Sequence, residues 1–234
     1  MGLTKTDFMR GMQCPKMLWL DKHKPKLKII PQEVQARLDA GNEFGDSAMG
    51  MFGPYEEMTI YRPGTNFPDK KAMAEKTKEH IKLGTPVICE AAFINYNNYC
   101  AVDILRKTET GYDFYEVKNS PEVHDQFVKD TGFQYFVLKR CGIKVGNIYV
   151  VTHGNDEDNP YVINDVTSEA KGLYKWVNDH IWDLNRRQKL TSEIEMPMGE
   201  QCCDPYDCWY CDYCRSLADL GECGINEDNA RSGN

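Results

Sequence analysis

The alternation of apolar and polar positions in the middle of the chain predicts a small antiparallel sheet. Three runs rich in β-branched and aromatic residues cover residues 86–95, 99–107 and 112–118. Turn-forming pairs, Asn97-Asn98 and Thr110-Gly111, separate them. Strands joined by such short turns pair with their sequence neighbours, so we expect a three-stranded β-meander.

Charged side chains interrupt this meander at its centre. Alternation in the third run places Glu116 and Lys118 on one face, which we expect to be open to solvent, and Val117 on the other. If Asp103 in the second run shares the first face, two carboxylates and an ammonium group converge. Carboxylate oxygens hold Mg²⁺ or Mn²⁺, the metal acidifies a bound water, and a lysine orients that water or offsets charge on a phosphate. The pattern suits phosphodiester hydrolysis, and the alternative is a solvated strand face.

Helical periodicity predicts helices on both sides of the meander. Residues 5–20 form a helix pair broken at Cys14-Pro15, and residues 69–83 form a polar helix. The predicted helix within 31–52 packs beside the sheet, with Gly41 and Gly45 permitting close contact.

Downstream of the meander the pattern predicts two more helices and two more strands. A helix over 122–141 carries Gln134 and stops at Gly142. Residues 147–152 lack alternation, which predicts a strand buried on both faces, and residues 161–164 add a short edge strand. One long amphipathic helix then follows over residues 167–190.

Asp103, the Glu116-Val117-Lys118 triplet and Gln134 resemble the PD-(D/E)XK nuclease superfamily, in particular its RecB-like branch, which includes the nucleases that accompany CRISPR adaptation. The order helix, three-stranded meander, helix, strand agrees with that family. The resemblance implies a restriction-endonuclease-like α/β (α+β) core. It also implies that Asp103, Glu116 and the Val117 carbonyl bind the metal and that Lys118 acts on water or phosphate.

Two further positions follow from the same resemblance. Glu90 corresponds to an acidic residue that acts as an outer-shell or second-metal ligand, and Gln134 corresponds to an accessory, DNA-contacting glutamine. The chain departs from the family's Gln-x-x-x-Tyr signature, because Leu138 stands in the tyrosine position. It also offers only Glu43 and Asp46 in the helix where many RecB-like members carry a histidine ligand.

Composition bounds the organisation of the chain. A chain of 234 residues with 41% hydrophobic content buries one substantial core, so we predict a main domain over 1–190 and a small lobe over 191–234. The sequence contains neither a membrane-length apolar run nor a signal peptide, so we expect a cytoplasmic location and no membrane partner. A net charge of −8 argues against a protein that coats nucleic acid, but it is compatible with an acidic metal site.

The predicted C-terminal lobe is rich in cysteine: Cys202, Cys203, Cys208, Cys211, Cys214 and Cys223. Without a secretion signal such a cluster favours metal binding over disulfides, and thiolates suit zinc or iron–sulfur centres. The family resemblance implies one [4Fe–4S] cluster, with a first ligand in the early Cys-Pro element.

That resemblance assigns the cluster ligands as Cys14, Cys203, Cys208 and Cys214. The trio Cys208, Cys211 and Cys214 is an alternative that also suits zinc. Cys89, Cys100 and Cys141 lie in apolar runs and are predicted core residues.

The sequence therefore predicts a Mg- or Mn-dependent deoxyribonuclease that acts on single-stranded DNA or on free DNA ends. A non-catalytic DNA-binding or assembly module with the same fold, and a zinc-stabilised interaction protein, are the alternatives. The sequence identifies no protein partner.

Overall fold

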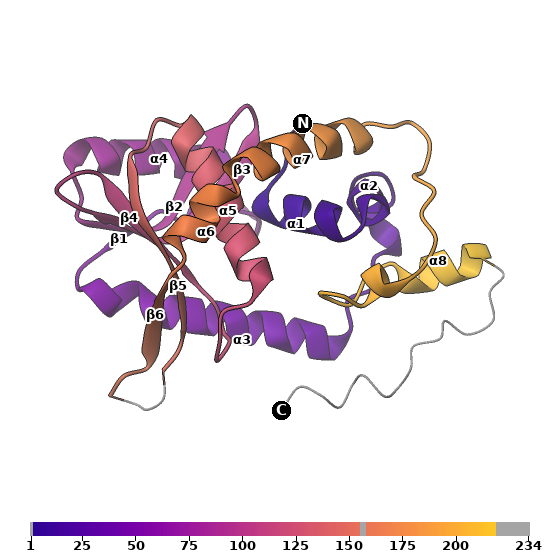
Figure 1. Ribbon diagram of the computed structural model, residues 1–234, viewed down its shortest axis with the longest axis horizontal. Coiled ribbons are helices and arrows are strands. Elements are labelled where there is room, and N and C mark those ends of the chain that lie inside the picture. Colours follow the sequence, from indigo (N-terminus) through magenta and orange to yellow (C-terminus); the bar gives the residue numbers. More distant parts are fainter. Residues whose placement is uncertain (1, 155–157, 219–234) are drawn as a thin grey trace.

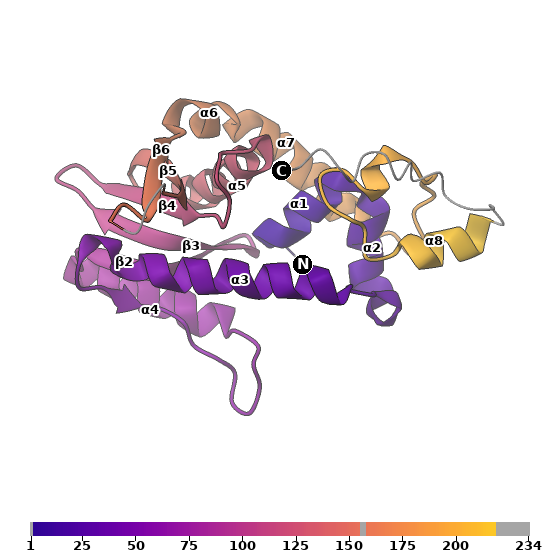
Figure 2. The same cartoon turned by 90° about the horizontal axis from the view of Figure 1, so that it is seen from below.

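The computed structural model describes residues 2–154 and 158–218 and shows a mixed α/β fold with a six-stranded sheet (Figure 1). Figure 2 shows helices α5, α6 and α7 on one side of the sheet and α3 and α4 on the other. The helices are α1 Lys5–Gln13, α2 Pro15–His23, α3 Gln32–Ala48, α4 Lys70–Leu83, α5 Asp125–Arg140, α6 Thr167–Gly172, α7 Tyr174–Arg187 and α8 Cys211–Ala218. The strands are β1 Glu56–Glu57, β2 Val87–Asn95, β3 Asn98–Lys107, β4 Tyr112–Val117, β5 Val145–His153 and β6 Tyr161–Asp165.

The strands lie in the sheet in their sequence order. Strands β2, β3 and β4 form the predicted antiparallel meander, and helix α5 crosses over to β5, which pairs in parallel with β4. Strand β6 forms the predicted edge. Strand β1 occupies the opposite edge and was not predicted, because two residues within a loop carry no periodicity.

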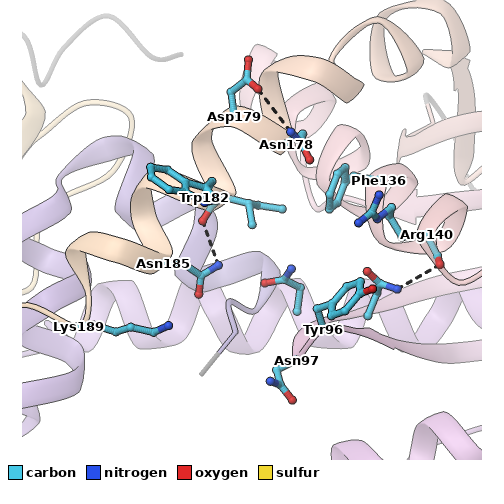
Figure 3. A pocket seen from close by; sticks show the side chains of 12 residues that line it. Tyr96, Asn97, Phe136, Arg140, Asn178, Asp179, Trp182, Asn185 and Lys189 are labelled. Carbon is cyan, nitrogen blue, oxygen red and sulfur yellow. Dashed lines mark hydrogen bonds between the residues drawn. The ribbon is translucent and has the colours of Figure 1, made fainter.

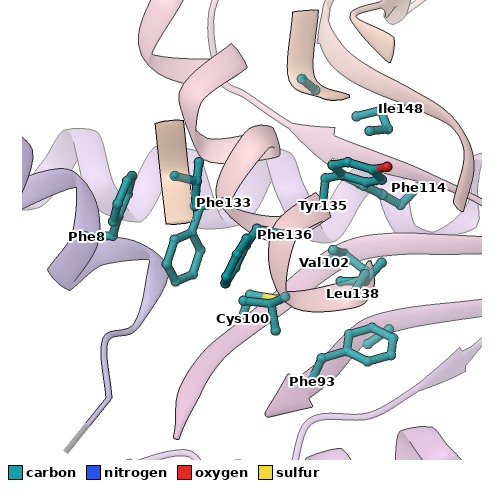
Figure 4. Close-up of a cluster of buried hydrophobic side chains, with 14 of the residues drawn as sticks. Phe8, Phe93, Cys100, Val102, Phe114, Phe133, Tyr135, Phe136, Leu138 and Ile148 are labelled. Atoms are coloured by element: carbon teal, nitrogen blue, oxygen red, sulfur yellow. The ribbon is translucent and has the colours of Figure 1, made fainter. Parts of the chain in front are cut away.

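A large apolar cluster fixes α1 and α5 against one face of the sheet (Figure 4). The ring centroids of Phe8 in α1 and Phe133 in α5 are 5.0 Å apart, and both side chains are fully buried. Phe136 of α5 and Val102 of β3 belong to the same cluster. Because buried contacts of this kind supply most of a fold's stability, α1 is held firmly against α5.

The alternation of side chains changes face at the middle of β2. Cys89 packs in the cluster beneath α3, whereas Ala91 packs in the cluster beneath α5. The residue between them, Glu90, has a left-handed backbone with a φ of 53°, which is uncommon for a residue with a side chain. The register Cys89↔Ile104 and Ala91↔Val102 places Asp103 beside this irregularity. Strict alternation, assumed from the sequence, therefore fails at two predicted site residues.

Two helix predictions need correction. The helix expected beside the sheet touches it only near its C-terminal end, around Phe44 and Ala48, while Leu38 is 43% exposed. Gly41 and Gly45 face open space, so they do not serve close packing. The predicted helix over 167–190 is two helices, α6 and α7, that meet at Leu173, directly after a glycine that weakens helical structure.

The start of α2 was predicted correctly, with Pro15 as its first residue. A separate apolar cluster joins this helix to the C-terminal segment through Trp19, Leu20, Ile194 and Tyr210. The division of the chain at residue 190 stays a prediction. Among the described residues, no helix is long and apolar enough to cross a membrane.

Candidate active site

Glu116 is the centre of a buried polar network between the sheet and two helices. Its Oε1 lies 2.5 Å from Nζ of Lys5 in α1 and 2.8 Å from Nζ of Lys118. Its Oε2 accepts a hydrogen bond of 2.6 Å from Nε2 of Gln134 in α5. Glu116 is only 1% exposed, so the expectation of a solvent-open strand face is wrong. Helices α1 and α5 cover this face, as the apolar cluster requires.

Lys118 joins Glu116 to a further carboxylate. Its Nζ lies 2.6 Å from Oδ2 of Asp130, one helical turn before Gln134 on the same face of α5. Burial opposes the charged form, but Asp130 and Glu116 together raise the pKa of Lys118 well above its ordinary value. Lys118 is thus a fixed cation. Asp130 was missed from the sequence, although its spacing of four residues from Gln134 was a usable signal.

Asp103 lies on the same side of the meander as Glu116. Its Oδ2 accepts a hydrogen bond of 2.6 Å from the backbone N–H of Val117. Burial and repulsion by Glu116 raise the pKa of Asp103 to about 7. Burial and repulsion by Asp103 likewise raise the pKa of Glu90 to about 8. The structure therefore brings Glu90, Asp103 and Glu116 close enough for their charges to oppose one another.

Glu116 differs from its two carboxylate neighbours. Burial disfavours its charge, but Lys118 and Lys5 outweigh that effect and lower the pKa of Glu116 to about 2. Glu116 is consequently ionised, whereas Asp103 and Glu90 hold their protons to near-neutral pH. Environments that push the pKa values of neighbouring carboxyl groups apart are typical of functional sites.

Gln134 is buried and donates a hydrogen bond to Glu116. It is 0% exposed, and its Nε2 also donates to the carbonyl of Ala101 at 3.0 Å. Its Oε1 has no hydrogen-bond partner within the described residues. The structure thus places Gln134 as a positioning residue for Glu116, and its burial is at odds with the direct DNA contact that the family resemblance implies.

The donor chemistry of the three carboxylates suits a hard divalent cation. Their mutual repulsion is the kind of unfavourable potential that a bound Mg²⁺ or Mn²⁺ relieves. Within the described part of the chain, however, no three His, Cys, Asp or Glu side chains are already arranged around one metal position. The Lys5 ammonium group occupies Oε1 of Glu116, so that oxygen becomes a ligand only if Lys5 moves.

Lys5 is the site residue that sequence reasoning missed completely. It lies 111 positions before Glu116 and has no motif around it. Its placement follows from the start of the chain. Thr4 and Asp7 form a capping box at the head of α1, and the N–H of Leu3 donates to the side-chain oxygen of Asn98, the first residue of β3. These contacts aim the first turn of α1 at the sheet.

The cysteines gather in a second site, between α2 and the segment 200–214, which we call the cysteine segment. One small cavity of about 10 Å³ is lined by Cys14, Cys202, Cys208, Cys211 and Cys214. Cys203 is exposed and does not line it. The structure therefore places Cys202, rather than the predicted Cys203, among the converging thiols. Cys223 lies outside the described residues.

Thiolates suit a thiophilic centre, but within the described residues no three of these thiols already surround one metal position. The Cys211 thiol donates to the Cys202 carbonyl. A side-chain interaction with Cys211 lowers the pKa of Cys208, whereas burial raises the pKa of Cys14 and of Cys214. A cavity of about 10 Å³ has room for roughly one water-sized particle. A space of this size is smaller than an iron–sulfur cluster, so such a cluster would require the thiols to move apart. Cys89 and Cys100 are buried in the core, as predicted.

Larger cavities lie elsewhere on the surface, including one of about 490 Å³ lined by Asp7, Lys70 and Tyr99. One of about 690 Å³ lies between the β2–β3 turn, α5 and α7, and Tyr96, Arg140 and Trp182 line it (Figure 3). The three site carboxylates line neither this cavity nor the one described next. A third cavity of about 340 Å³ opens beside Lys5, Lys118 and Asp130. Access to the polar network is therefore through the third cavity, which we call the Lys118 cavity.

Comparison with known proteins gives limited guidance. No known family matches the chain, and no curated protein matches it. One similar solved structure is the crystal structure of LHK-Exo in complex with dAMP, at 12% sequence identity and a TM-score of 0.37 over 80% of this chain and 92% of that chain. A likeness at this level carries no argument, and the function must be argued from the residues of this chain.

The two raised pKa values predict that the metal-free protein loses stability as pH rises. Asp103 and Glu90 titrate near 7 and 8 in the fold, above their ordinary values of 3.8 and 4.5. The folded state therefore binds more protons than the unfolded state between about pH 4 and pH 8, and stability falls across that window. In EDTA the melting temperature should be several degrees lower at pH 8.5 than at pH 5.5. Asp103→Asn should flatten this dependence, and an unchanged slope in that variant would contradict the assignment.

Proposed function

We propose that the protein is a divalent-metal-dependent deoxyribonuclease whose active centre is the Glu90, Asp103, Glu116 and Lys118 cluster. The observation that carries this proposal is the Glu116 network, in which a buried, ionised carboxylate meets two lysines beside two protonated carboxyl groups. Several carboxyl groups held together in the protein interior cost folding stability, which a bound divalent cation would offset.

Each residue has a separate task in this proposal. Asp103 and Glu116 hold the metal, with the Val117 peptide fixed beside Asp103, and Glu90 supports it as an outer or second ligand. Lys118 offsets negative charge that develops on the phosphate, and Asp130 holds its ammonium group in place. Bound Mg²⁺ or Mn²⁺ supplies an acidified water and Lewis-acid stabilisation of the phosphate.

Lys5 and Gln134 are positioning residues in this scheme. Gln134 fixes the orientation of the Glu116 carboxylate from the buried side. Lys5 neutralises the same carboxylate from the side of the Lys118 cavity. Because an ammonium group and a divalent cation would compete for Oε1 of Glu116, Lys5 would have to leave that oxygen for Glu116 to hold the metal, and its place on the cavity wall would then let it contact a phosphate.

We further propose that four of the five converging thiols, Cys14 among them, hold one metal centre that joins α2 to the cysteine segment. A [4Fe–4S] cluster is the assignment that follows from the family resemblance, and zinc is the alternative. The convergence of residues 14 and 202–214 on one cavity supports a single centre. Its role in this proposal is to fix the C-terminal segment and not to take part in phosphodiester chemistry.

A specific observation also favours a second candidate, a non-catalytic DNA-binding module. Both oxygens of Glu116 are already engaged, by Lys5, Lys118 and Gln134. A carboxylate neutralised in this way resembles a structural ion-pair network as much as a poised metal ligand. Under this reading the Lys118 cavity binds DNA but the site does not cut it.

A cleavage assay separates the two candidates. End-labelled single-stranded and double-stranded DNA are incubated with the protein and Mn²⁺ or Mg²⁺, and a parallel reaction contains EDTA. We expect metal-dependent degradation that starts at free ends and stops in EDTA. DNA that binds but stays uncut with both metals and with every end structure would favour the binding module.

A further inference from the structure

The Lys118 cavity has the composition of a nucleotide pocket. Basic side chains on its wall include Lys5, Arg10, Arg37 and Lys118, against Asp130 and Asp207. Apolar and aromatic side chains line the remainder, among them Leu38, Tyr206 and Trp209. A mixture of cations for a phosphate and flat or apolar surfaces for a base is what single nucleotide units require.

The size of the cavity restricts the form of DNA that fits. Its volume of about 340 Å³ lies near the lower end of the roughly 300–1,000 Å³ of small-ligand sites. Such a space takes one nucleotide unit and not the width of a base-paired duplex. Lys5, Lys118 and Asp130 form part of its wall, whereas Glu90, Asp103 and Glu116 do not line it, so a phosphate of a bound nucleotide lies within reach of Lys118.

The cysteine segment supplies one wall of this cavity through Pro205, Tyr206, Asp207 and Trp209. Two contacts with α1 fix the wall. Nε2 of Gln13 donates to the carbonyl oxygens of Gln201 at 2.9 Å and Tyr206 at 2.5 Å. The guanidinium of Arg10 lies 3.8 Å from the ring centroid of Trp209. Tyr206 is therefore presented by a braced loop.

Tyr206 itself is both accessible and close to the active centre. Its side chain is 48% exposed although it lines a cavity. Tyr206 shares the wall of this cavity with Lys118 and Asp130, and burial and the charge of Asp130 raise the pKa of Tyr206. Arg37 on α3 also acts on Tyr206, and it forms no ion pair within the described residues. An aromatic ring and a guanidinium on the wall of one cavity are suited to a base and its phosphate.

We propose that Tyr206 is a base-stacking residue and that the Lys118 cavity holds the terminal nucleotide of a single DNA strand. This inference rests on the proposed function and extends it by naming the substrate form and the residue that positions it. Arg37 contacts a phosphate of the same strand end. The C-terminal cysteine segment is then part of the substrate site and not an independent appendage.

A binding assay that does not depend on cleavage tests the proposal. The probe is a fluorescein-labelled single-stranded thymidine oligonucleotide, titrated in EDTA and followed by fluorescence anisotropy. Tyr206→Ala should raise Kd by roughly tenfold or more, the usual effect of removing a stacking ring. Tyr206→Phe should retain binding, because the ring and not the hydroxyl makes the contact. Arg37→Ala should weaken binding with a reduced dependence on salt concentration.

Matched controls keep the result specific. Tyr61, which is 57% exposed and lies outside the cavity, should tolerate replacement by alanine without a change in Kd. An oligonucleotide with abasic terminal positions should abolish the difference between wild type and Tyr206→Ala. Equal Kd values for those two proteins on the intact probe, or no binding by wild type, would overturn the inference.

The outcomes also separate this inference from the proposed activity. Tyr206-dependent binding without cleavage in any metal would retain the nucleotide pocket and reject the nuclease. If wild type and Tyr206→Ala both cleave DNA with metal and have the same KM, the proposed nuclease activity stands and the stacking role of Tyr206 is wrong. If both ideas hold, Tyr206→Ala should raise KM much more than it lowers kcat, because stacking contributes to the bound substrate and the transition state alike.

Discussion

Replacing Glu116 with glutamine should reduce metal-dependent DNA cleavage by more than about a hundredfold. Loss of an outer partner of a metal ligand already costs roughly 10- to 100-fold, and Glu116 is proposed as a ligand itself. The substitution keeps the shape of the side chain but removes the charge that faces Lys5 and Lys118. The measurement is the initial rate on end-labelled DNA with saturating Mn²⁺, divided by the folded fraction from thermal melting.

Correction for folding matters here because Glu116 is buried. Removing one member of a buried ion pair can cost about 3–5 kcal/mol, so a fall in activity could reflect unfolding. The double variant Lys5→Met, Glu116→Gln also removes the Lys5 ammonium group, which loses its partner in the single variant. It should regain part of the stability without regaining activity. Glu109→Gln, at an exposed position after β3, is the matched control and should behave as wild type. Full cleavage by folded Glu116→Gln protein would refute the proposed active centre.

Cys14→Ser should remove the thiol-bound metal centre and destabilise the whole chain. A link from residue 14 to the cysteine segment closes a loop of nearly two hundred residues, and cross-links of that span contribute up to roughly 5 kcal/mol in the loop-closure relation. Metal content and melting temperature should therefore fall together. The measurement is iron, zinc and sulfide analysis of protein purified without oxygen, combined with thermal melting.

The structure provides two controls for this experiment. Cys203→Ser alters an exposed cysteine outside the cavity, and Cys89→Ser alters a core cysteine; neither should change metal content. About four irons per chain with matching sulfide would identify a [4Fe–4S] cluster, whereas one zinc without sulfide would identify the alternative. Unchanged metal content in Cys14→Ser, or loss of metal in Cys203→Ser, would contradict the ligand set taken from the cavity.

The sequence alone determined the elements whose signals are local. Alternation and turn pairs defined β2, β3 and β4, because strand periodicity and turn preference act over a few residues. Proline at position 15 and glycine at position 142 marked helix boundaries for the same reason. The spacing of Glu116 and Lys118 on one strand was also enough to place them together, and they form an ion pair in the fold.

Contacts between residues that are distant in the sequence were determined only by the tertiary structure. No local signal places Lys5 against Glu116, because the contact arises from packing of Phe8 on Phe133 and from the hydrogen bond of Leu3 to Asn98 at the start of β3. The same packing buried the strand face that alternation left open to solvent. The change of face at Glu90 was equally hidden, because a left-handed residue within a strand has no signature in the pattern of apolar positions.

The cysteines show the same division between local and distant information. Their number and crowding near the C-terminus favoured a metal centre on composition alone. Which thiols converge was decided by the path of the chain around residue 202, where a one-residue difference turns Cys202 inward and leaves Cys203 exposed. No signal in the sequence indicated Tyr206 either. Tyr206 shares a cavity wall with Lys118 and Asp130 only because α2 and the cysteine segment pack together.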